Sequence, residues 1–302
     1  MNRNASDNVE RLQLMVIGVQ KGGTTSLSNY LAEHPGIRSP LCVEFTFFTD
    51  EAEHANGAGA YWSRFLPTDE RTGLKAIAKM STLYHSLEGL ARLREHAPDC
   101  QLALVLRDPV SRCYSAYRMA CFDGWLSFDP EWLKKLLEEA SPGDELHDLF
   151  IGYGHYASYI ERIWELFPRE QVHIFRFEDL QRDPQLVCDV LFTAMGIGPW
   201  TLQGKEKVHN ETVMARSDKA ARFIHWLREE RNPIKRAVRR LIPYEVYLRI
   251  ADKFIGMNRS DRQFPPLDPD VRAALASHYR PHDQRLAQLL GWDLSRWTSQ
   301  RS

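Results

Sequence analysis

The sequence contains little cysteine, and its cysteines form no Cys-x-x-Cys pair. Five of the 302 residues are cysteines, far fewer than in secreted scaffolds that depend on disulfides. Their odd number and lack of metal-ligand spacing disfavour a zinc site or a catalytic cysteine. They favour a reducing compartment in which thiols act as small apolar residues. The five are Cys42, Cys100, Cys113, Cys121 and Cys188.

Long apolar runs are also missing. No stretch approaches the roughly eighteen apolar residues that a membrane-spanning helix needs. Residues 1–10 form a polar tail, and the apolar run 12–19 that follows is too short for a secretory leader. These absences predict a soluble, cytoplasmic protein, in which the sequons at Asn4, Asn210 and Asn258 are chance matches.

Neither sign of charge is in excess. The chain has 39 Lys and Arg against 40 Asp and Glu, a formal net charge of −1, whereas nucleic-acid binders usually carry a basic excess. A local basic site for a small anion is still compatible with this balance. Because 43% of the residues are hydrophobic, a chain of this length can bury a large core without disulfides or metals.

What the sequence does contain is an alternation of apolar strands and amphipathic helices. Two continuous apolar runs, Leu12–Gly18 and Gln101–Arg107, are typical of strands buried on both faces of a parallel sheet. A third strand is expected at 171–177 and a weaker one at 75–80, and helices are expected at 24–33, 87–96, 109–119 and 156–167. This order predicts an α/β fold with a mainly parallel central sheet.

The pattern changes near the C-terminus. From about Trp200 onward it indicates helices and loops without a convincing strand. We therefore expect a helical C-terminal extension, with residues 204–258 as a helical insertion, inside a single domain over residues 1–302.

A glycine-rich turn follows the first expected strand and precedes the first expected helix. Its glycines allow a tight turn close to an anion, and the first N–H groups of the helix are unsatisfied and carry the positive end of the helix dipole. A lysine adds a full charge, and three hydroxyl groups add donors. We interpret the turn as an anion site; the alternative is a plain tight turn. Its residues after Gln20 are Lys21, Gly22, Gly23, Thr24, Thr25 and Ser26.

The order of these residues differs from that of a Walker A loop. In a Walker loop the lysine follows the glycine, whereas Lys21 precedes Gly22 and Gly23 here. The strand that ends at Arg107 provides no clear carboxylate for Mg²⁺, since Asp108 precedes a proline as a turn residue. An ATPase or a P-loop kinase is therefore disfavoured.

Two motifs resemble those of sulfotransferases that use 3′-phosphoadenosine 5′-phosphosulfate (PAPS). KGGTTSL resembles the family's 5′-phosphosulfate loop, and LVLRDPVSRCYSAYRM resembles its 3′-phosphate motif, with Arg107 and Ser115 as the phosphate ligands. Both follow expected parallel strands, and ligands of open α/β sheets bind at that edge. The resemblance implies a P-loop-like three-layer fold, with helices on both faces of the sheet.

Further stretches resemble the heparan sulfate sulfotransferases and their bacterial relatives. HPGIRSPLCVEFTFF resembles a segment of the form HP…KE-x-x-FF, which implies that Glu44 is the catalytic base; Val43 stands where the family has lysine. AKMSTLY resembles an E-K-[ST]-P segment and retains Lys79, although Ala78 replaces the glutamate. In the middle region, Tyr156 falls at a matching aromatic position.

Near the C-terminus, RSDRQFPPLDPDVRAAL resembles a cofactor loop of the type S-K-G-R. Arg262 matches its arginine and is expected to contact the donor. Ser260 and Asp261 replace the loop's lysine and glycine, and Arg259 is the candidate substitute. Whether the loop 259–262 closes on the donor stays open at this point.

The resemblance implies transfer of the sulfuryl group from PAPS to a hydroxyl group, with an amine as the alternative, leaving 3′-phosphoadenosine 5′-phosphate (PAP). Glu44 would accept the proton, Lys21 would neutralise the leaving phosphate, and Lys79 would hold Glu44 or an anionic acceptor, without a metal. The alternatives are a nucleotide or small-molecule kinase and an inactive PAP-binding protein.

The acceptor is not specified by the sequence, and small-molecule, glycan and lipid-linked acceptors all fit. Residues 228–254 are rich in arginine and lysine, which indicates either a solvated helix or a basic rim that attracts an anionic or membrane-associated acceptor and makes peripheral membrane contact. His85, Asn210 and Arg216 are further candidate site residues. Four aromatic residues either wall an acceptor pocket or belong to a core: Phe122, Trp125, Phe128 and Trp132.

Overall fold

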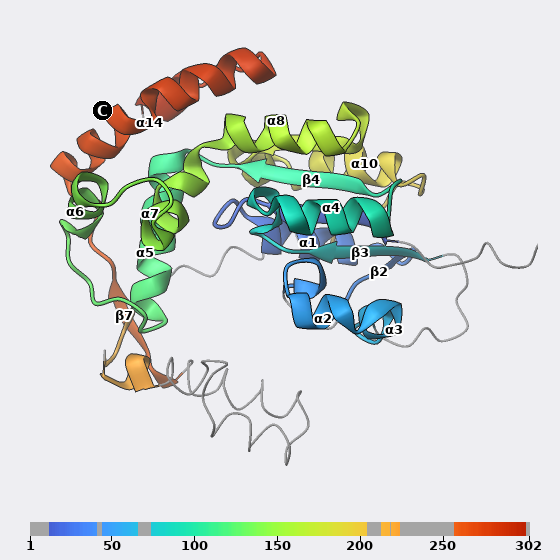
Figure 1. The fold of residues 1–302 in the computed structure, drawn as a ribbon, viewed down its shortest axis with the longest axis horizontal. Coiled ribbons are helices and arrows are strands. Elements are labelled where there is room, and N and C mark those ends of the chain that lie inside the picture. Colours follow the sequence, from blue (N-terminus) through green and yellow to red (C-terminus); the bar gives the residue numbers. More distant parts are fainter. Residues whose placement is uncertain are drawn as a thin grey trace, which may run out of the picture. The chain divides into compact units, whose positions relative to one another are not determined.

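Five parallel strands form the central sheet of the protein (Figure 1), in the order β2-β3-β1-β4-β5. The computed structural model describes residues 12–40, 44–65, 74–203, 213–217, 219–223 and 257–299. The strands are β1 Leu12–Gly18, β2 Ile37–Arg38, β3 Lys75–Lys79, β4 Gln101–Leu106 and β5 Val172–Arg176. The four longer strands confirm the sequence prediction to within one residue at each end, whereas the two-residue β2 was not expected.

The chain divides into two compact units. The first contains Met1–Asp108, His155–His209 and Gln288–Leu290; the second contains Pro109–Gly154, Asn210–Ala287 and Gly291–Ser302. The five-stranded sheet belongs to the first unit. The expectation of a single domain over residues 1–302 stays a prediction, and each unit is described by itself.

Helices connect and cover the strands of the first unit. Three of the four helices expected from the sequence are among them, and the fourth, which begins at Pro109, belongs to the second unit. The described helices of the first unit are α1 Thr24–Ala32, α2 Glu51–Ala55, α3 Gly57–Trp62, α4 Leu87–His96, α8 Tyr156–Leu166, α9 Phe177–Arg182 and α10 Pro184–Ala194, with 3₁₀ turns η1 Thr46–Phe48, η2 Leu83–His85 and η4 Arg169–Gln171.

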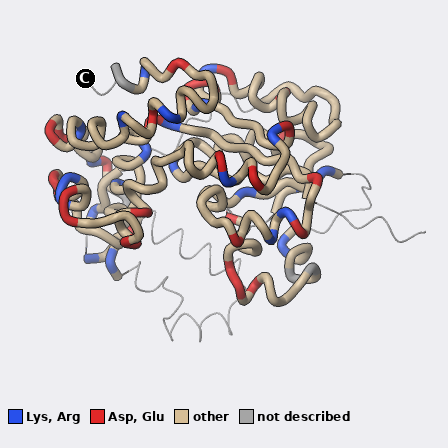
Figure 2. Tube along the Cα trace, turned by 45° about the horizontal axis from the view of Figure 1, so that its top comes forward, with Lys and Arg blue, Asp and Glu red and all other residues tan. Residues whose placement is uncertain are grey.

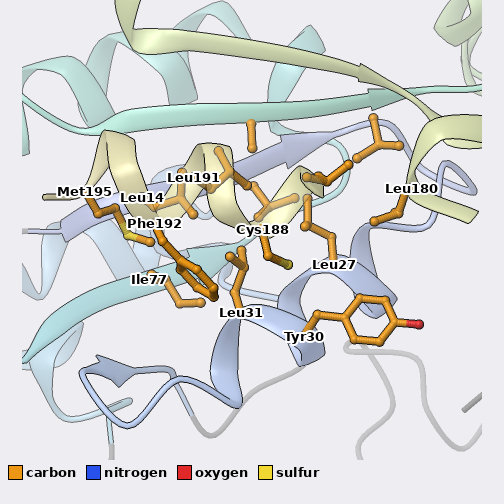
Figure 3. Packing of buried hydrophobic residues seen from close by; sticks show 14 of the residues in the cluster. Leu14, Leu27, Tyr30, Leu31, Ile77, Leu180, Cys188, Leu191, Phe192 and Met195 are labelled. Atoms are coloured by element: carbon orange, nitrogen blue, oxygen red, sulfur yellow. The ribbon is translucent and has the colours of Figure 1, made fainter. Parts of the chain in front are cut away.

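The three central strands β3, β1 and β4 are buried on both faces, as the continuous apolar runs of β1 and β4 predicted. On one face, Leu14 and Val16 of β1 pack against Leu27 and Leu31 of α1 and against α10 (Figure 3). Residues that alternate with these, such as Met15, are also fully buried. The crossover through α4 runs along the sheet in the opposite direction to that through α1, so right-handed connections place these helices on opposite faces.

Local signals set the helix starts. Ser86 precedes α4 and accepts a hydrogen bond from the Gly89 amide at 3.1 Å, while Asp183 caps α10, whose first residue is Pro184. Side chains of this kind satisfy N–H groups that have no partner within the helix, and proline fits the first helical position.

The second unit has its own core, built around α5. Val110, Tyr117 and Phe150 pack there with Tyr279. Its elements are α5 Pro109–Phe122, α6 Trp132–Glu139, α7 Glu145–Phe150, η3 Gly152–Gly154, β6 Val213–Ala215, β7 Arg259–Gln263, α14 Pro269–Leu290 (for most of its length) and α15 Ser295–Ser299.

The antiparallel pair β6–β7 corrects the expectation that no strand follows Trp200. β6 (VMA) has only three residues, and β7 (RSDRQ) is polar, so neither has both the length and the apolar composition of a recognisable strand. Pairing with a partner strand, rather than intrinsic preference, determines such strands.

Several predictions concern residues outside the described ranges. These are the polar tail 1–10, most of the helical insertion 204–258, the basic segment 228–254 with its proposed membrane contact, and the residues Cys42, Val43 and Asn210. They stay predictions. Within the described helices, none combines the length and apolar character that crossing a lipid bilayer requires.

The described cysteines are buried thiols, as expected. Burial raises the pKa of Cys188 to about 12 and also raises the pKa of Cys100, so these thiols stay protonated and unreactive. Charged residues of both signs are interspersed along the described trace (Figure 2). An anion site among the described residues must therefore come from a few placed groups rather than from a general basic surface.

Candidate active site

The glycine-rich turn between β1 and α1 adopts a backbone conformation that brings it close to the sheet. Lys21 has φ 69° and Gly23 has φ 89°. Both values lie in the left-handed region of φ, which residues other than glycine rarely adopt. The Gly22 amide donates to the Val19 carbonyl at 2.8 Å, which closes the turn. Lysine in this region is uncommon, and such outliers concentrate at functional sites.

Gly22 lies where no side chain would fit. A Cβ added there would stand 2.2 Å from the Val105 carbonyl oxygen of β4 and 2.9 Å from Val19 Cγ2. The turn therefore packs directly on the backbone of a central strand. Glycine at this position is required by close packing, whereas the positive φ at position 23 favours glycine.

The N-terminus of α1 is open to an anion. Its cap residue is Gly23, so no side chain caps the helix, and its first turn holds no acidic residue. Unsatisfied N–H groups at such a terminus, together with the helix dipole, favour negative charge. Thr24, Thr25 and Ser26 add hydroxyl groups in the same turn, and Thr24 is buried. The turn therefore fits a phosphate or phosphosulfate group.

Arg107 supports this turn from the end of β4. Its Nη1 donates to the Lys21 carbonyl at 3.1 Å, and its guanidinium lies over the Phe177 ring, 4.8 Å from the centroid. The Arg107 carbonyl in turn accepts a hydrogen bond from the Tyr156 hydroxyl at 2.8 Å. The structure thus brings together Lys21 and Arg107, which the sequence assigned to two different phosphates.

Glu44 lies beside the turn and is held by three donors. Lys79 Nζ donates to Oε1 at 2.8 Å, Ser81 Oγ donates to Oε1 at 3.0 Å, and the Ser81 amide donates to Oε2 at 2.8 Å. Lys79 Nζ also donates to Thr25 Oγ1 at 3.1 Å. The expected contact between Lys79 and Glu44 is therefore present, and Lys79 links that carboxylate to the glycine-rich turn.

The sheet and an aromatic cluster position these groups. Lys79 ends β3, pairs in register with Val16 of β1 and has a side chain only 5% exposed. The Phe45 amide donates to the Lys79 carbonyl at 2.7 Å. The cluster that anchors η1 comprises Phe45, Phe47, Phe48 and Tyr61, with ring centroids 5.0 to 6.2 Å apart. The FTFF run therefore fixes the backbone next to Glu44.

Three other predicted residues lie in the second unit. Ser115 is buried in α5, whereas Arg262 is exposed in β7, where its amide donates to Ser260 Oγ at 3.2 Å. The Arg216 amide donates to the Asn258 carbonyl at 2.6 Å. Their contacts with the donor stay predictions, as does that of Arg259, whose side chain is not described.

Two further predictions concern His85 and the aromatic residues that either wall an acceptor pocket or belong to a core. His85 is half-buried and lies against the rings of Tyr84 and Tyr159, at 5.5 and 6.4 Å, and its role stays open. Trp132 stacks on Tyr117 at 5.0 Å, and Phe128 packs in the same core, which supports the core interpretation for these two residues. Trp125 is 40% exposed.

Sequence reasoning missed Ser81. It follows Lys79 by two residues, at the end of β3, and contacts a carboxylate 37 positions earlier in the chain. No spacing rule identifies such a contact. The one available signal was a hydroxyl residue just beyond an expected strand end, at the edge where sites of α/β folds form.

The geometry agrees with comparisons to known proteins. The family model described as the sulfotransferase domain matches residues 11–218. The bifunctional heparan sulfate N-deacetylase/N-sulfotransferase 3 of Homo sapiens is 29% identical over 304 residues, which cover 95% of this chain and 31% of that protein. Heparan sulfate glucosamine 3-O-sulfotransferase 3B1 of Mus musculus is 35% identical over 105 residues, 35% of this chain and 26% of that protein.

The chain spans about a third of the length of the first of these relatives. Among solved structures, the sulfotransferase from Alicyclobacillus acidocaldarius superposes with a TM-score of 0.65 at 23% identity, covering 96% of this chain and all of that one. The shared fold confirms the expected parallel sheet flanked by helices. The matched range includes the glycine-rich turn, Glu44, Lys79, Arg107 and Ser115, and it ends before Arg262.

Proposed function

This chain belongs to the sulfotransferase domain family, which takes its sulfuryl group from PAPS, and we propose that it transfers that group to a hydroxyl group of a carbohydrate acceptor. The heparan sulfate named in the relatives supports a glycan. An amine acceptor is the second candidate, because the relative that covers 95% of this chain is named an N-sulfotransferase. Lipid-linked and secondary-metabolite hydroxyls are tested as further acceptors.

The link from Glu44 through Lys79 to Thr25 carries this proposal. Lys79 Nζ contacts the carboxylate at 2.8 Å and the hydroxyl of the glycine-rich turn at 3.1 Å. A sulfuryl transfer needs a proton acceptor next to the group that binds the donor's reacting end, because the incoming oxygen and the leaving oxygen flank the same sulfur. A single buried lysine joins these two sites.

Each side chain of the site has a separate role in the proposed sulfuryl transfer. Glu44 accepts the proton of the acceptor hydroxyl as its oxygen bonds to sulfur, while the bond between sulfur and the 5′-phosphate oxygen breaks. Lys21 and the open N-terminus of α1 neutralise the charge that grows on that phosphate. Residues 21–26 would hold the phosphosulfate, and Arg107 would hold the 3′-phosphate. A positioned base of this kind typically contributes about 10²–10⁴-fold in rate.

The test is a transfer assay with labelled PAPS. The purified chain is offered a glycan with free hydroxyl groups, the same glycan bearing free amines, and simple lipid-linked and phenolic acceptors. Transfer to the first supports the proposal, and transfer to the amine alone supports the second candidate. Glu44→Gln should lower kcat by roughly 10²–10⁴-fold, whereas Glu88→Gln, at an exposed carboxylate of α4, should retain it. A wild-type kcat in Glu44→Gln would refute the role of Glu44 as the base.

Thermal shift separates the remaining alternatives. At a ligand concentration of 100 times Kd, binding to the folded state adds about 2.7 kcal/mol of stability. PAP should therefore stabilise the protein strongly, and ATP with Mg²⁺ should not. The reverse result would support a kinase. PAP binding without transfer to any acceptor class would support an inactive binding protein.

A further inference from the structure

Ser81 makes two hydrogen bonds to the same carboxylate. The residue is only 8% exposed. Its amide donates to Glu44 Oε2 at 2.8 Å, and its hydroxyl donates to Glu44 Oε1 at 3.0 Å. Two donors from one residue, one on each oxygen, fix the plane of a carboxylate as well as its position.

The two oxygens of Glu44 are not equivalent. Oε1 accepts hydrogen bonds from Lys79 Nζ and Ser81 Oγ, while Oε2 accepts one from the Ser81 amide. A carboxylate oxygen offers about two acceptor sites. Among the described residues, Oε1 is therefore filled, and Oε2 keeps one site for a further donor. The Glu44 side chain is 36% exposed, so the carboxylate is not sealed inside the protein.

Lys79 contacts Oε1 alone and does not by itself fix the direction of the carboxylate. A lysine ammonium is a point charge on a flexible stem and has no fixed fork to orient a carboxylate. Its Nζ is also shared with Thr25 Oγ1. The direction of the Glu44 carboxylate therefore depends on Ser81, whose amide is fixed by the backbone at the end of β3.

We propose that Ser81 is a positioning residue that orients Glu44 so that Oε2 receives the proton of the acceptor. This inference rests on the proposed function of Glu44 as the base. A base must stand within hydrogen-bond reach of the proton that it takes. A misplacement of about 1 Å can lower the rate by roughly 10²-fold.

Two substitutions at position 81 test the hydroxyl. Ser81→Ala removes the bond to Oε1 and keeps the amide, whereas Ser81→Thr keeps both donors. In the labelled PAPS assay, Ser81→Ala should lower kcat about tenfold, with the KM for PAPS and the thermal shift by PAP unchanged. Ser81→Thr should restore most of the lost kcat. The control is Ser86→Ala, which removes a hydroxyl that caps α4 and should lower Tm without lowering kcat.

A double-mutant cycle makes the test independent of stability. If Ser81 acts through Glu44, Ser81→Ala should lower kcat much less in the Glu44→Gln background than in the wild-type chain. Equal effects in both backgrounds would overturn the inference. So would wild-type kcat in Ser81→Ala, or an equal loss in the Ala and Thr variants. If instead Glu44→Gln keeps full activity, Glu44 is not the base and the proposed function of this residue is wrong. That result differs from one in which Glu44→Gln loses activity and Ser81→Ala keeps it, which overturns only the role of Ser81.

Discussion

Replacing Gly22 with alanine tests whether the glycine-rich turn is held against β4 by close packing. The added Cβ would meet the Val105 carbonyl oxygen at 2.2 Å and Val19 Cγ2 at 2.9 Å, whereas real Cβ contacts are essentially never under 3.0 Å. The nearest obstacle is the backbone of a central strand, which cannot rotate away as a side chain can. Either the turn or the strand must therefore move.

The expected cost follows from these contacts. Forcing an extra carbon into a packed site costs about 1–3 kcal/mol. The Val19 amide also donates to the same Val105 oxygen at 3.3 Å, and loss of that bond adds about 0.5–1.5 kcal/mol. Alanine also lowers the conformational entropy of the unfolded chain, which offsets about 0.4–1 kcal/mol of this loss of stability. A net loss of about 2 kcal/mol corresponds to a fall in Tm of roughly 4–8 °C.

The functional effect should be larger than the effect on stability. A turn displaced from β4 no longer presents its N–H groups to the donor's phosphate. Loss of one hydrogen bond to a charged group costs about 1.5–3 kcal/mol, so the Kd for PAP should rise roughly 10- to 100-fold. Calorimetric titration with PAP measures this Kd, and a thermal scan measures Tm.

Gly59→Ala is the matched control. Gly59 lies inside α3, and nothing stands within 4 Å of an added Cβ. Alanine is favoured over glycine in a helix by about 0.5–1 kcal/mol, so Tm should stay level or rise and PAP binding should not change. If Gly22→Ala behaved like Gly59→Ala in both measurements, the argument from close packing would be refuted.

Three further variants change two cations of the first unit and a histidine of the second. Lys79→Met removes the link between Glu44 and the turn and should lower kcat about 10²-fold; wild-type turnover would contradict the link. Arg107→Lys keeps the charge but loses the planar group over Phe177, so PAP binding should weaken about tenfold; unchanged titration curves would contradict this. Burial and two neighbouring histidines lower the pKa of His278 to about 4. The unfolded chain therefore takes up this proton first, and the folded state loses stability as pH falls from 6.5 towards 4. His278→Gln should flatten that decline in denaturant titrations, and an unchanged slope would contradict the assignment.

The centre of the sheet could be predicted because β1 and β4 are buried on both faces. Such strands must be apolar throughout, so β1 and β4 are visible as continuous runs in the sequence. The short strands β2, β6 and β7 could not be predicted. Their residues pair with a partner that is distant in the sequence, as Ile37 does with Lys75, and their composition carries no trace of that pairing.

The candidate site likewise contains some residues that could be predicted from the sequence and others that only the fold identifies. The glycine-rich turn could be predicted because its residues are consecutive and follow a strand, and Glu44 was assigned through the family resemblance. The groups that hold these residues are distant in the chain: Ser81 contacts Glu44 across 37 positions and Arg107 contacts Lys21 across 86. A sequence pattern shows which residues can do the chemistry, whereas only the fold shows which residues orient them.

Arg107 shows why this difference matters for interpreting a variant. The sequence assigned it to the 3′-phosphate, yet its Nη1 also donates to the Lys21 carbonyl in the turn assigned to the 5′-phosphosulfate. A guanidinium has five N–H donors, so one residue can serve both ends of the ligand. Adenosine 5′-monophosphate, which lacks the 3′-phosphate, separates the two roles. If Arg107 orders the turn, Arg107→Lys should weaken binding of this ligand as well as of PAP; if it acts on the 3′-phosphate alone, only PAP binding should weaken, and the supporting role would be refuted.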